Sequence, residues 1–307
     1  MVRLSIVIAT KDRPERLRKC LTAISNQTKR PYEIMIVDGS SKPYRGLKAL
    51  TRRNSSRNSS GTGGFSVENH PRKGIHVIYR NQKSSMVEAR NIGIRHVTGD
   101  VVLFLDDDAF IEKEYIEKLL EFYRSHPEAG GAEGRIVNEK APRLLDRLLN
   151  FPTFPERDDL MRVWRLHGCN MSFRREVFRD FMFDERLIGY YNDDDEFCGR
   201  ISQKYKMFFI PSARLIHDQT QYGGARIDHY TNYNTLVFNQ FYSLTTIQRK
   251  NIFDVFGYLL SQIIMIVRAF MFIKVDKHTA IKGIARGYQR VLYAIMKNNV
   301  VEQIRRL

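Results

Sequence analysis

The chain has 307 residues, and 43% of them are hydrophobic, which argues against a disordered protein and allows a substantial core. Its 50 Lys and Arg residues outnumber its 34 Asp and Glu residues, so the formal net charge is +16 and an anionic partner is expected: nucleic acid, a membrane surface or a polyanionic substrate. The three cysteines lack CxxC spacing and are odd in number, which argues against a disulfide framework or structural zinc site and favours a reducing compartment.

The first third of the sequence alternates between strand and helix patterns. Short apolar runs rich in β-branched residues predict strands at residues 4–10, 32–37, 74–79 and 101–105. Apolar residues spaced three and four apart predict helices at residues 14–26 and 86–96, the first with Asp12 in its N-cap region. Near-continuous apolar strands between helices predict an α/β fold whose mostly parallel, twisted sheet is covered on both faces.

The remaining elements are less regular. Residues 51–74 are rich in Ser, Asn and Gly with basic residues between them, and they predict a surface loop. The alternative is a basic lid over an anionic ligand. Farther along, helices are expected near Arg174 and over residues 193–204, and a strand-like segment over residues 207–217.

Two apolar segments bear on the location of the protein. The opening run MVRLSIVIAT is too short for a signal peptide, so a cytoplasmic protein is expected. Residues 252–275 are apolar but are interrupted by Arg268, and their unbroken run falls short of the roughly 18–20 residues that span a bilayer. This segment is either a buried helix or an interfacial one, and the basic residues after it favour membrane contact. Residues 221–307 are therefore predicted to form a helical, membrane-associated region.

Acidic side chains follow three of the predicted strands. Asp12 comes shortly after the first strand, Asp38 follows the second, and Asp106–Asp108 follow the fourth directly. Ligands of parallel α/β sheets bind beyond the carboxyl ends of the strands, so these acids are expected to converge on one site. Three consecutive carboxylates repel one another unless a cation offsets the repulsion, and Mg²⁺ or Mn²⁺ prefers such oxygen ligands. The alternative is a solvated turn in which Asp108 caps a helix.

Five segments, taken in their order and spacing, form a specific pattern: TKDRPERLRKCL, IVDGSS, EARNIGI, GDVVLFLDDD and GCNMSFRREVF. This set resembles the family 2 glycosyltransferases, which are inverting enzymes of the GT-A fold, over about residues 1–220. The resemblance implies a Rossmann-like nucleotide-sugar-binding half at residues 1–110 and an acceptor half at residues 111–220. It also implies a nucleotide-diphospho-sugar donor and Mg²⁺ or Mn²⁺ as cofactor.

The resemblance also implies roles for individual residues. Nucleotide-sugar contacts are implied for Thr10, Asp12, Arg13, Asp38, Gly39, Arg90, Asp106 and Asp107. Metal binding is implied for Asp108 above all, and also for Asp106 and His217, although a lone histidine is more often structural. A loop that meets donor and acceptor is implied for His167, Gly168, Cys169 and Asn170. Trp164, the only tryptophan, comes just before this loop and is expected either in the core or stacked on a sugar or lipid acceptor.

A second acidic cluster, YYNDDDEFCGR at residues 190–200, supplies the candidates for the catalytic base. An inverting transfer needs a base to deprotonate the attacking hydroxyl, and carboxylates among carboxylates suit this task. Asp194 is the first candidate and Asp193 the second. The sequence departs from the family pattern here, because Asp193 replaces the usual Glu and Asp195 adds a carboxylate. The alternative is an acidic helix N-terminus favoured by the helix dipole.

Together these features predict a metal-dependent inverting glycosyltransferase that modifies a lipid-linked or cell-envelope glycan at the inner face of the cell membrane. A nucleotidyltransferase is the alternative enzyme, but the segment IATKDRPERL lacks the glycine-rich phosphate loop that such an enzyme usually has. A non-catalytic nucleic-acid-binding protein would gather cations and aromatic residues on one face. The acids here gather at strand ends instead, so no nucleic-acid partner is expected.

Overall fold

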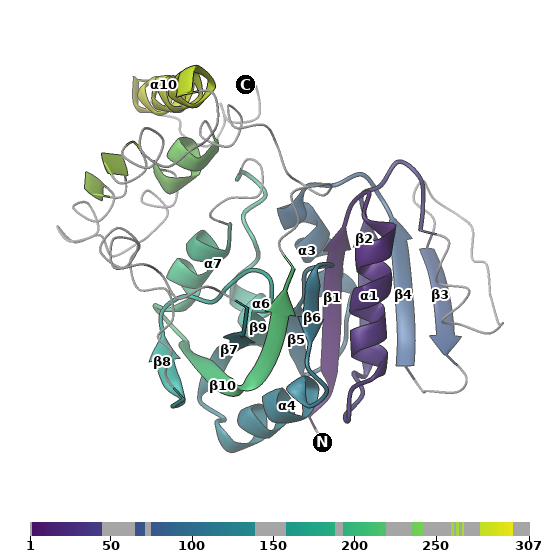
Figure 1. The fold of residues 1–307 in the computed structure, drawn as a ribbon. Coiled ribbons are helices and arrows are strands. Elements are labelled where there is room, and N and C mark those ends of the chain that lie inside the picture. The colour runs from purple at the N-terminus through teal and green to yellow at the C-terminus, as the bar shows by residue number, and fades with distance from the viewer. Residues whose placement is uncertain are drawn as a thin grey trace. The chain divides into compact units, whose positions relative to one another are not determined.

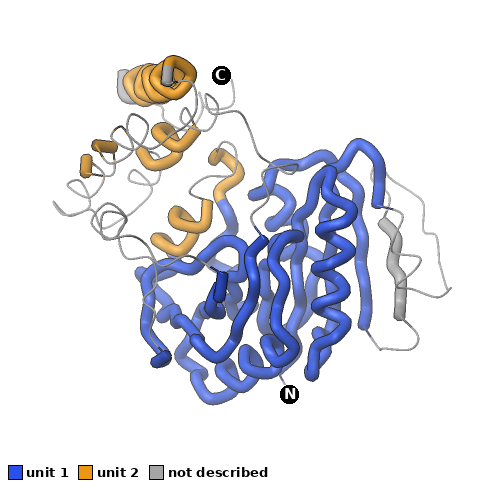
Figure 2. The backbone as a smooth tube through the Cα atoms, viewed as in Figure 1, with its two compact units in different colours: residues 1–183, 201–224 blue, residues 184–200, 225–307 orange. Residues whose placement is uncertain are grey.

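The computed structural model describes residues 2–44, 65–70, 75–138, 158–187, 193–218, 235–241, 259–260, 262–263, 266 and 277–296. The chain forms two compact units (Figure 2). The first unit comprises residues 1–183 and 201–224, and the second comprises residues 184–200 and 225–307. The division expected at residue 220 stays a prediction.

One sheet runs through the first unit (Figure 1). Its strands are β1 (Leu4–Thr10), β2 (Glu33–Asp38), β3 (Phe65–His70), β4 (Ile75–Asn81), β5 (Val101–Phe104), β6 (Ala109–Ile111), β7 (Ala129–Ile136), β8 (Met161–Val163), β9 (Ser172–Arg174) and β10 (Lys206–His217). Within the described residues their order is β3-β4-β2-β1-β5-β9-β7-β10-β6, and β8 pairs with β10. β1 pairs in parallel with β2 and β5, and β2 pairs in parallel with β4, so the carboxyl ends of these four strands lie along one edge.

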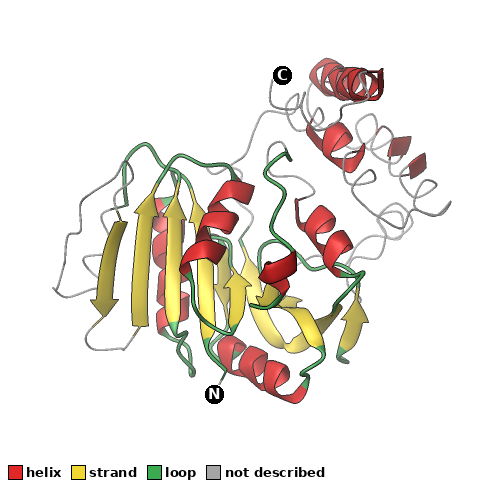
Figure 3. Cartoon of the chain, turned by 180° about the vertical axis from the view of Figure 1, so that it is seen from behind, coloured by secondary structure: helices red, strands yellow, loops and turns green. Residues whose placement is uncertain are grey.

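Helices cover both faces of this sheet, as the front and back views show (Figures 1 and 3). The helices of the first unit are α1 (Pro14–Ser25), α3 (Met86–His96), α4 (Tyr115–Ser125) and α6 (Val177–Asp180). α1 lies on one face of the sheet and α3 on the opposite face. Every residue of β2 and nearly every residue of β1 is buried, as expected of strands that are covered on both sides.

The predicted α/β architecture is confirmed, with differences in detail. The sheet is mixed, because β9 pairs antiparallel with both β5 and β7. The predicted loop at residues 51–74 contains β3, which pairs antiparallel with β4, while its other residues lie outside the described part. The helix expected near Arg174 is α6, which begins three residues later at Val177, while Arg174 itself is the last residue of the short strand β9. The fully buried Phe173 lies in β9, which pairs with β5 on one side and β7 on the other.

The start of α1 also differs from its predicted capping. Its N-cap is Arg13, without a side-chain cap hydrogen bond. Asp12 has φ of 54°, in the left-handed region that Asp tolerates better than most residues. Its backbone N–H donates to Oγ of Ser40 over 2.6 Å. Asp12 is thus an exposed turn residue between β1 and α1 and does not cap the helix.

The contact of α3 with β1 depends on a glycine, and this gives a stability prediction. A Cβ on Gly93 would lie 2.3 Å from Cγ1 of Val7, so neither side can accommodate it without a shift. We expect Gly93→Ala to lower the free energy of unfolding by about 1–3 kcal/mol, measured by urea denaturation. Gly199→Ala is the matched control, because its Cβ would meet nothing within 4 Å and alanine favours a helix. Equal stability of the two variants would contradict the close packing.

The second unit contains α7 (Asp193–Ile201) and α10 (Lys277–Met296). Among the described residues, its hydrophobic core contains Leu187, Val237, Phe238, Ala280, Ile284 and Val291. Gln262 is buried beside this core; it donates to Oε1 of Gln240 over 2.6 Å and accepts from the Tyr288 hydroxyl over 3.1 Å. No helix in the described part of the chain is long and apolar enough to cross a bilayer. Most of the apolar segment at residues 252–275 lies outside the described residues.

Candidate active site

The three aspartates form the turn that follows β5 at the carboxyl edge of the sheet. The N–H of Ala109 donates to the carbonyl of Asp106 over 3.0 Å, and β6 begins at Ala109. The alternative in which Asp108 caps a helix is therefore wrong, because a strand follows it. The next helix, α4, begins later and has Glu114 at its N-cap.

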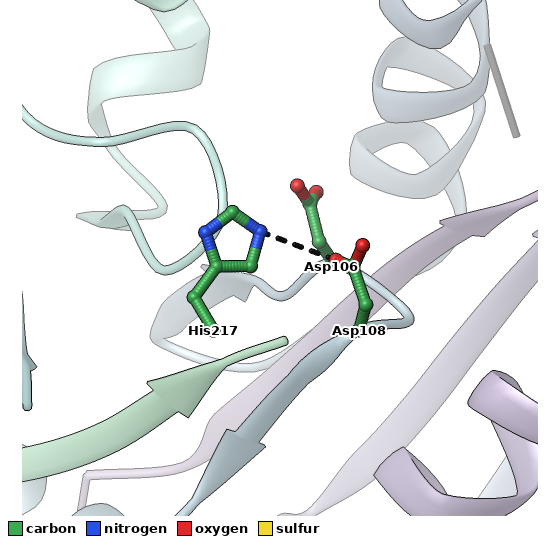
Figure 4. Close-up of side chains that lie close together, drawn as sticks. All are labelled: Asp106, Asp108 and His217. Atoms are coloured by element: carbon green, nitrogen blue, oxygen red, sulfur yellow. Dashed lines mark ion pairs between the residues drawn. The ribbon is translucent and has the colours of Figure 1, made fainter. Parts of the chain in front are cut away.

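His217 reaches this turn through the pairing of β10 with β6. The antiparallel register sets His217 opposite Ala109, the residue that follows Asp108. Nε2 of His217 lies 3.2 Å from Oδ1 of Asp108. Figure 4 marks this ion pair with a dashed line. One ligand atom each from Asp106, Asp108 and His217 lie within 4.8 Å of one another. Two carboxylates and one imidazole are a donor set that fits a divalent cation such as Mn²⁺ or Mg²⁺.

Burial and mutual repulsion shift the titration of this cluster. Burial, together with the charges of the neighbouring aspartates, raises the pKa of Asp106 to about 7, although nearby cations oppose the shift. Burial also raises the pKa of Asp107. It acts in the same direction on Asp108, but the contact with His217 outweighs it and lowers the pKa of Asp108. The cluster thus gathers more negative charge than its burial favours, and a divalent cation would relieve this.

The middle aspartate is held by the protein itself. The hydroxyl of Thr10, at the end of β1, donates to Oδ2 of Asp107 over 2.6 Å. Nη1 of Arg13 donates to Oδ1 of Asp107 over 3.0 Å and to Oδ2 of Asp108 over 3.1 Å. Thr10 and Arg13 thus hold the turn after β5 in place through hydrogen bonds to Asp107 and Asp108. The group of side chains that could hold a metal ion contains Asp106 and Asp108 but not Asp107.

Arg90 connects this turn to the loop that precedes β9. The Arg90 guanidinium lies 3.8 Å from Oδ1 of Asp106 and donates to the carbonyl of Gly168 over 3.1 Å. It also lies over the ring of Phe183, 5.4 Å from the centroid. The N–H of Asp106 donates to the carbonyl of Cys169 over 3.1 Å. The predicted donor-side arginine and the predicted acceptor-side loop therefore meet at the same aspartate.

Asp38 anchors the loop that follows β2. Its side chain is buried, and its carboxylate accepts hydrogen bonds from the hydroxyl of Tyr79 over 2.6 Å and from the N–H of Ser40 over 2.9 Å. The N–H of Gly39 donates to the carbonyl of Thr10 over 2.8 Å, which joins this loop to the end of β1. The acids of all three strand ends thus lie along one edge of the sheet, as the sequence predicts.

Comparison with known proteins decides the family. The model of the glycosyl transferase family 2 matches residues 5–182, more than half of the chain. This chain belongs to glycosyl transferase family 2. The glycosyltransferase is 29% identical over 228 residues to YwdF, an uncharacterized glycosyltransferase of Bacillus subtilis, and the match covers 70% of this chain and 74% of that protein. It is 26% identical over 168 residues to a glucosyl-dolichyl phosphate glucuronosyltransferase of Haloferax volcanii, covering 50% of this chain and 52% of that protein.

A solved structure gives the fold. The mannosyltransferase PcManGT from Pyrobaculum calidifontis, in complex with GDP-Man and Mn²⁺, matches with a TM-score of 0.56 and 16% sequence identity. The match covers 95% of this glycosyltransferase and 81% of that chain. The predicted family, the GT-A fold and the glycosyltransferase activity are thereby confirmed.

The remaining predicted residues fall in two places. Trp164 follows β8 and is 57% exposed, so the alternative that it belongs to the core of the glycosyltransferase is wrong. Asp193 and Asp194 are the first two residues of α7, in the second unit, and their role as base stays a prediction. Glu196, in the same helix turn, is paired with Arg200 over 2.5 Å and is less suited to that role.

Sequence reasoning missed three residues that shape this site. Tyr79 and Ser40 hold the carboxylate of Asp38, and Glu133, on β7, binds His167. Glu133 could have been found, because it is the one charged residue in the small-residue run AGGAEG, which is buried throughout. Ser40 could also have been found, because it lies only two residues after Asp38, whereas the contact of Tyr79 arises only when β2 and β4 pair.

Proposed function

We propose that this glycosyltransferase is a metal-dependent inverting enzyme that transfers a sugar from a nucleotide-diphospho-sugar to a hydroxyl of a lipid-linked or cell-envelope glycan. The observation that carries the proposal is the cluster of Asp106, Asp108 and His217 at the carboxyl edge of the sheet. GDP-Man and Mn²⁺ in the structure of PcManGT support the choice of donor class and cofactor. The dolichyl phosphate substrate in the name of the Haloferax volcanii relative supports a lipid-linked acceptor.

The donor side of the reaction uses the carboxyl edge. Asp106, Asp108 and His217 would hold Mg²⁺ or Mn²⁺, which when bound neutralises charge on the leaving diphosphate. Thr10 and Arg13 keep Asp107 and Asp108 in place, since both donate hydrogen bonds to this turn. The nucleoside is proposed to bind the exposed carboxylate of Asp12 and the loop around Asp38 and Gly39, which follow the neighbouring strands β1 and β2.

The acceptor side needs a base. In an inverting transfer the acceptor hydroxyl attacks the anomeric carbon from the side opposite the leaving diphosphate and loses its proton to a carboxylate. Asp194 is proposed for this role, with Asp193 as the alternative, because the resemblance to the family places the base in this acidic cluster. Exposed Trp164 is proposed to stack on the acceptor.

A donor panel tests the proposed function. Thermal unfolding is measured with individual nucleotide-diphospho-sugars, each with and without Mn²⁺, because a bound ligand raises the melting temperature. We expect at least one donor to stabilise the protein only when the metal is present. NMR of the transfer product is then expected to show the anomeric configuration opposite to that of the donor. Retained configuration would contradict an inverting reaction, and a metal-independent shift would contradict the cofactor.

The exposed face of α10 supports the proposed membrane contact. Ile281, Leu292 and Tyr293 are exposed apolar or aromatic side chains on this helix, and Lys282 and Arg286 are exposed cations beside them. An exposed apolar stripe with flanking cations suits the interface of an anionic lipid surface. Peripheral contact of the second unit with the inner face of the cell membrane is therefore proposed.

Vesicle flotation tests this contact. We expect the wild-type protein to float with vesicles that contain phosphatidylglycerol. The double variant Ile281→Gln, Leu292→Gln is expected to bind these vesicles at least about tenfold more weakly, because two apolar side chains are no longer buried in the membrane interface. Leu160→Gln is the control, since Leu160 is an exposed leucine of the first unit. Unchanged flotation of the double variant would return α10 to a purely structural role.

A further inference from the structure

Glu133 is a fully buried carboxylate next to the active site. It lies on β7 with 0% exposure, although glutamate is rarely buried to this extent. Its Oε2 accepts a hydrogen bond from the backbone N–H of His167 over 2.6 Å and lies 3.1 Å from Nδ1 of the same residue. Among the described residues Oε1 has no hydrogen-bond partner. Burying a carboxylate with one oxygen unpartnered costs free energy, which suggests that its contact with His167 has a function.

His167 is the first residue of a loop, residues 167–170, that contacts the turn of Asp106–Asp108. The N–H of Asn170 donates to the carbonyl of His167 over 3.1 Å and closes this loop. Inside it, the carbonyl of Cys169 accepts from the N–H of Asp106, and the carbonyl of Gly168 accepts from Arg90. A chain of contacts therefore connects Glu133 to a proposed metal ligand: Glu133 binds His167, and two residues later the loop binds the backbone of Asp106.

The contact also sets the chemistry of the imidazole. An ionised carboxylate only accepts hydrogen bonds, so Nδ1 of His167 must carry the hydrogen in this arrangement. Neutral imidazole in water prefers the other tautomer, with the hydrogen on Nε2. Two residues after His167, the carbonyl of Cys169 accepts a hydrogen bond from the N–H of Asp106, which is one of the proposed metal ligands. The orientation and tautomer of His167 are therefore expected to influence how the cluster binds a metal ion.

We propose that Glu133 is a positioning residue: it fixes His167 in the Nδ1–H tautomer and holds the loop from His167 to Asn170 against the metal turn at Asp106. The inference deepens the proposed function and rests on it for the metal. A purely structural buried carboxylate would affect only the stability of the fold. Glu133 is expected to affect the tautomer of His167 and the affinity of the cluster for Mn²⁺ as well.

Three variants separate these roles. Glu133→Met has a similar shape and removes both acceptors, whereas Glu133→Gln keeps one acceptor oxygen. Glu33→Gln is the matched control, because Glu33 is also a buried carboxylate: it accepts from Oγ of Ser5 over 2.7 Å at the amino end of β2, the opposite edge of the sheet. The readouts are the histidine tautomer from long-range ¹H–¹⁵N spectra of ¹⁵N-histidine-labelled protein, with His167 assigned by His167→Gln, and Mn²⁺ binding by electron paramagnetic resonance.

We expect His167 to be in the Nδ1–H tautomer in the wild type and in Glu133→Gln, and to change to the Nε2–H tautomer in Glu133→Met. The Kd for Mn²⁺ is expected to rise by about tenfold or more in Glu133→Met. Glu33→Gln is expected to lower the melting temperature with neither change. A wild-type His167 in the Nε2–H tautomer overturns the proposal, as does a Glu133→Met variant that is destabilised but keeps the wild-type tautomer and Kd.

The variants remain decisive under two complications. If Glu133→Met does not fold, the wild-type tautomer and the spectrum of Glu133→Gln still test the proposal. If the wild type binds neither Mn²⁺ nor any donor, the proposed function fails, and the Nδ1–H tautomer still decides whether Glu133 orients His167.

Discussion

Asp108→Asn will lower kcat/KM for sugar transfer by roughly a thousandfold or more, because a divalent cation at a leaving diphosphate contributes several kcal/mol to the stability of the transition state. The change removes one carboxylate of the cluster while it keeps the size of the side chain. It also removes the charge that faces His217 and Arg13. Initial rates with the donor from the thermal-shift panel, at saturating Mn²⁺, measure the effect. Undiminished transfer would contradict the assignment of the metal site.

Asp100→Asn provides the matched control for this variant. Asp100 immediately precedes β5, at the end of the strand opposite the metal turn, and its exposed carboxylate pairs with Arg3 over 3.3 Å. Exposed pairs contribute little, so the free energy of unfolding is expected to change by less than about 1 kcal/mol. Transfer is expected to stay at the wild-type rate. A loss of activity in this control as large as in Asp108→Asn would point to a general effect of charge removal.

Asp194→Asn will bind the donor as the wild type does and lose transfer. A general base contributes about a hundred- to ten-thousandfold to the rate, and the amide cannot accept the proton of the attacking hydroxyl. The donor-induced thermal shift is expected to be unchanged, because the proposed donor site is formed by the first unit. Lost transfer with an unchanged thermal shift identifies Asp194 as the base, whereas a lost thermal shift would identify it as a donor-binding residue.

The neighbouring acids of α7 complete this test. Asp193→Asn and Asp195→Asn change the same charge in the same helix turn. Both are expected to keep at least part of the activity that Asp194→Asn loses. An active Asp194→Asn with an inactive Asp193→Asn would move the role of base to Asp193, which is the more buried of the two.

The strand-end acids show how far the sequence predicts this site. Near-continuous apolar runs predict β1, β2 and β5, and the carboxyl ends of parallel strands must share an edge. The convergence of Asp12, Asp38 and Asp106–Asp108 on that edge follows from these two facts alone. The approach of His217 does not, because it depends on the register of β10 against β6. Its place at the end of a predicted strand left a structural role equally open, and the resemblance to the family favoured the metal.

The parts that were not predicted depend on contacts between distant segments. β9 is three residues long, too short for any periodicity, and it is defined by its pairing with β5 and β7. Its Phe173 packs against Phe104 and Phe178. The position of β3 likewise depends on its pairing with β4. The role proposed for Glu133 needs the loop at His167 to return beside β7, which no local pattern specifies.

A crystal grown with Mn²⁺ and a nucleoside diphosphate tests the central claim most directly, through an anomalous difference map at the manganese edge. The account predicts a single strong peak within bonding distance of Asp106, Asp108 and His217, with the diphosphate on its open side. A peak at another group of side chains, or bound diphosphate with no peak at this cluster, would contradict it.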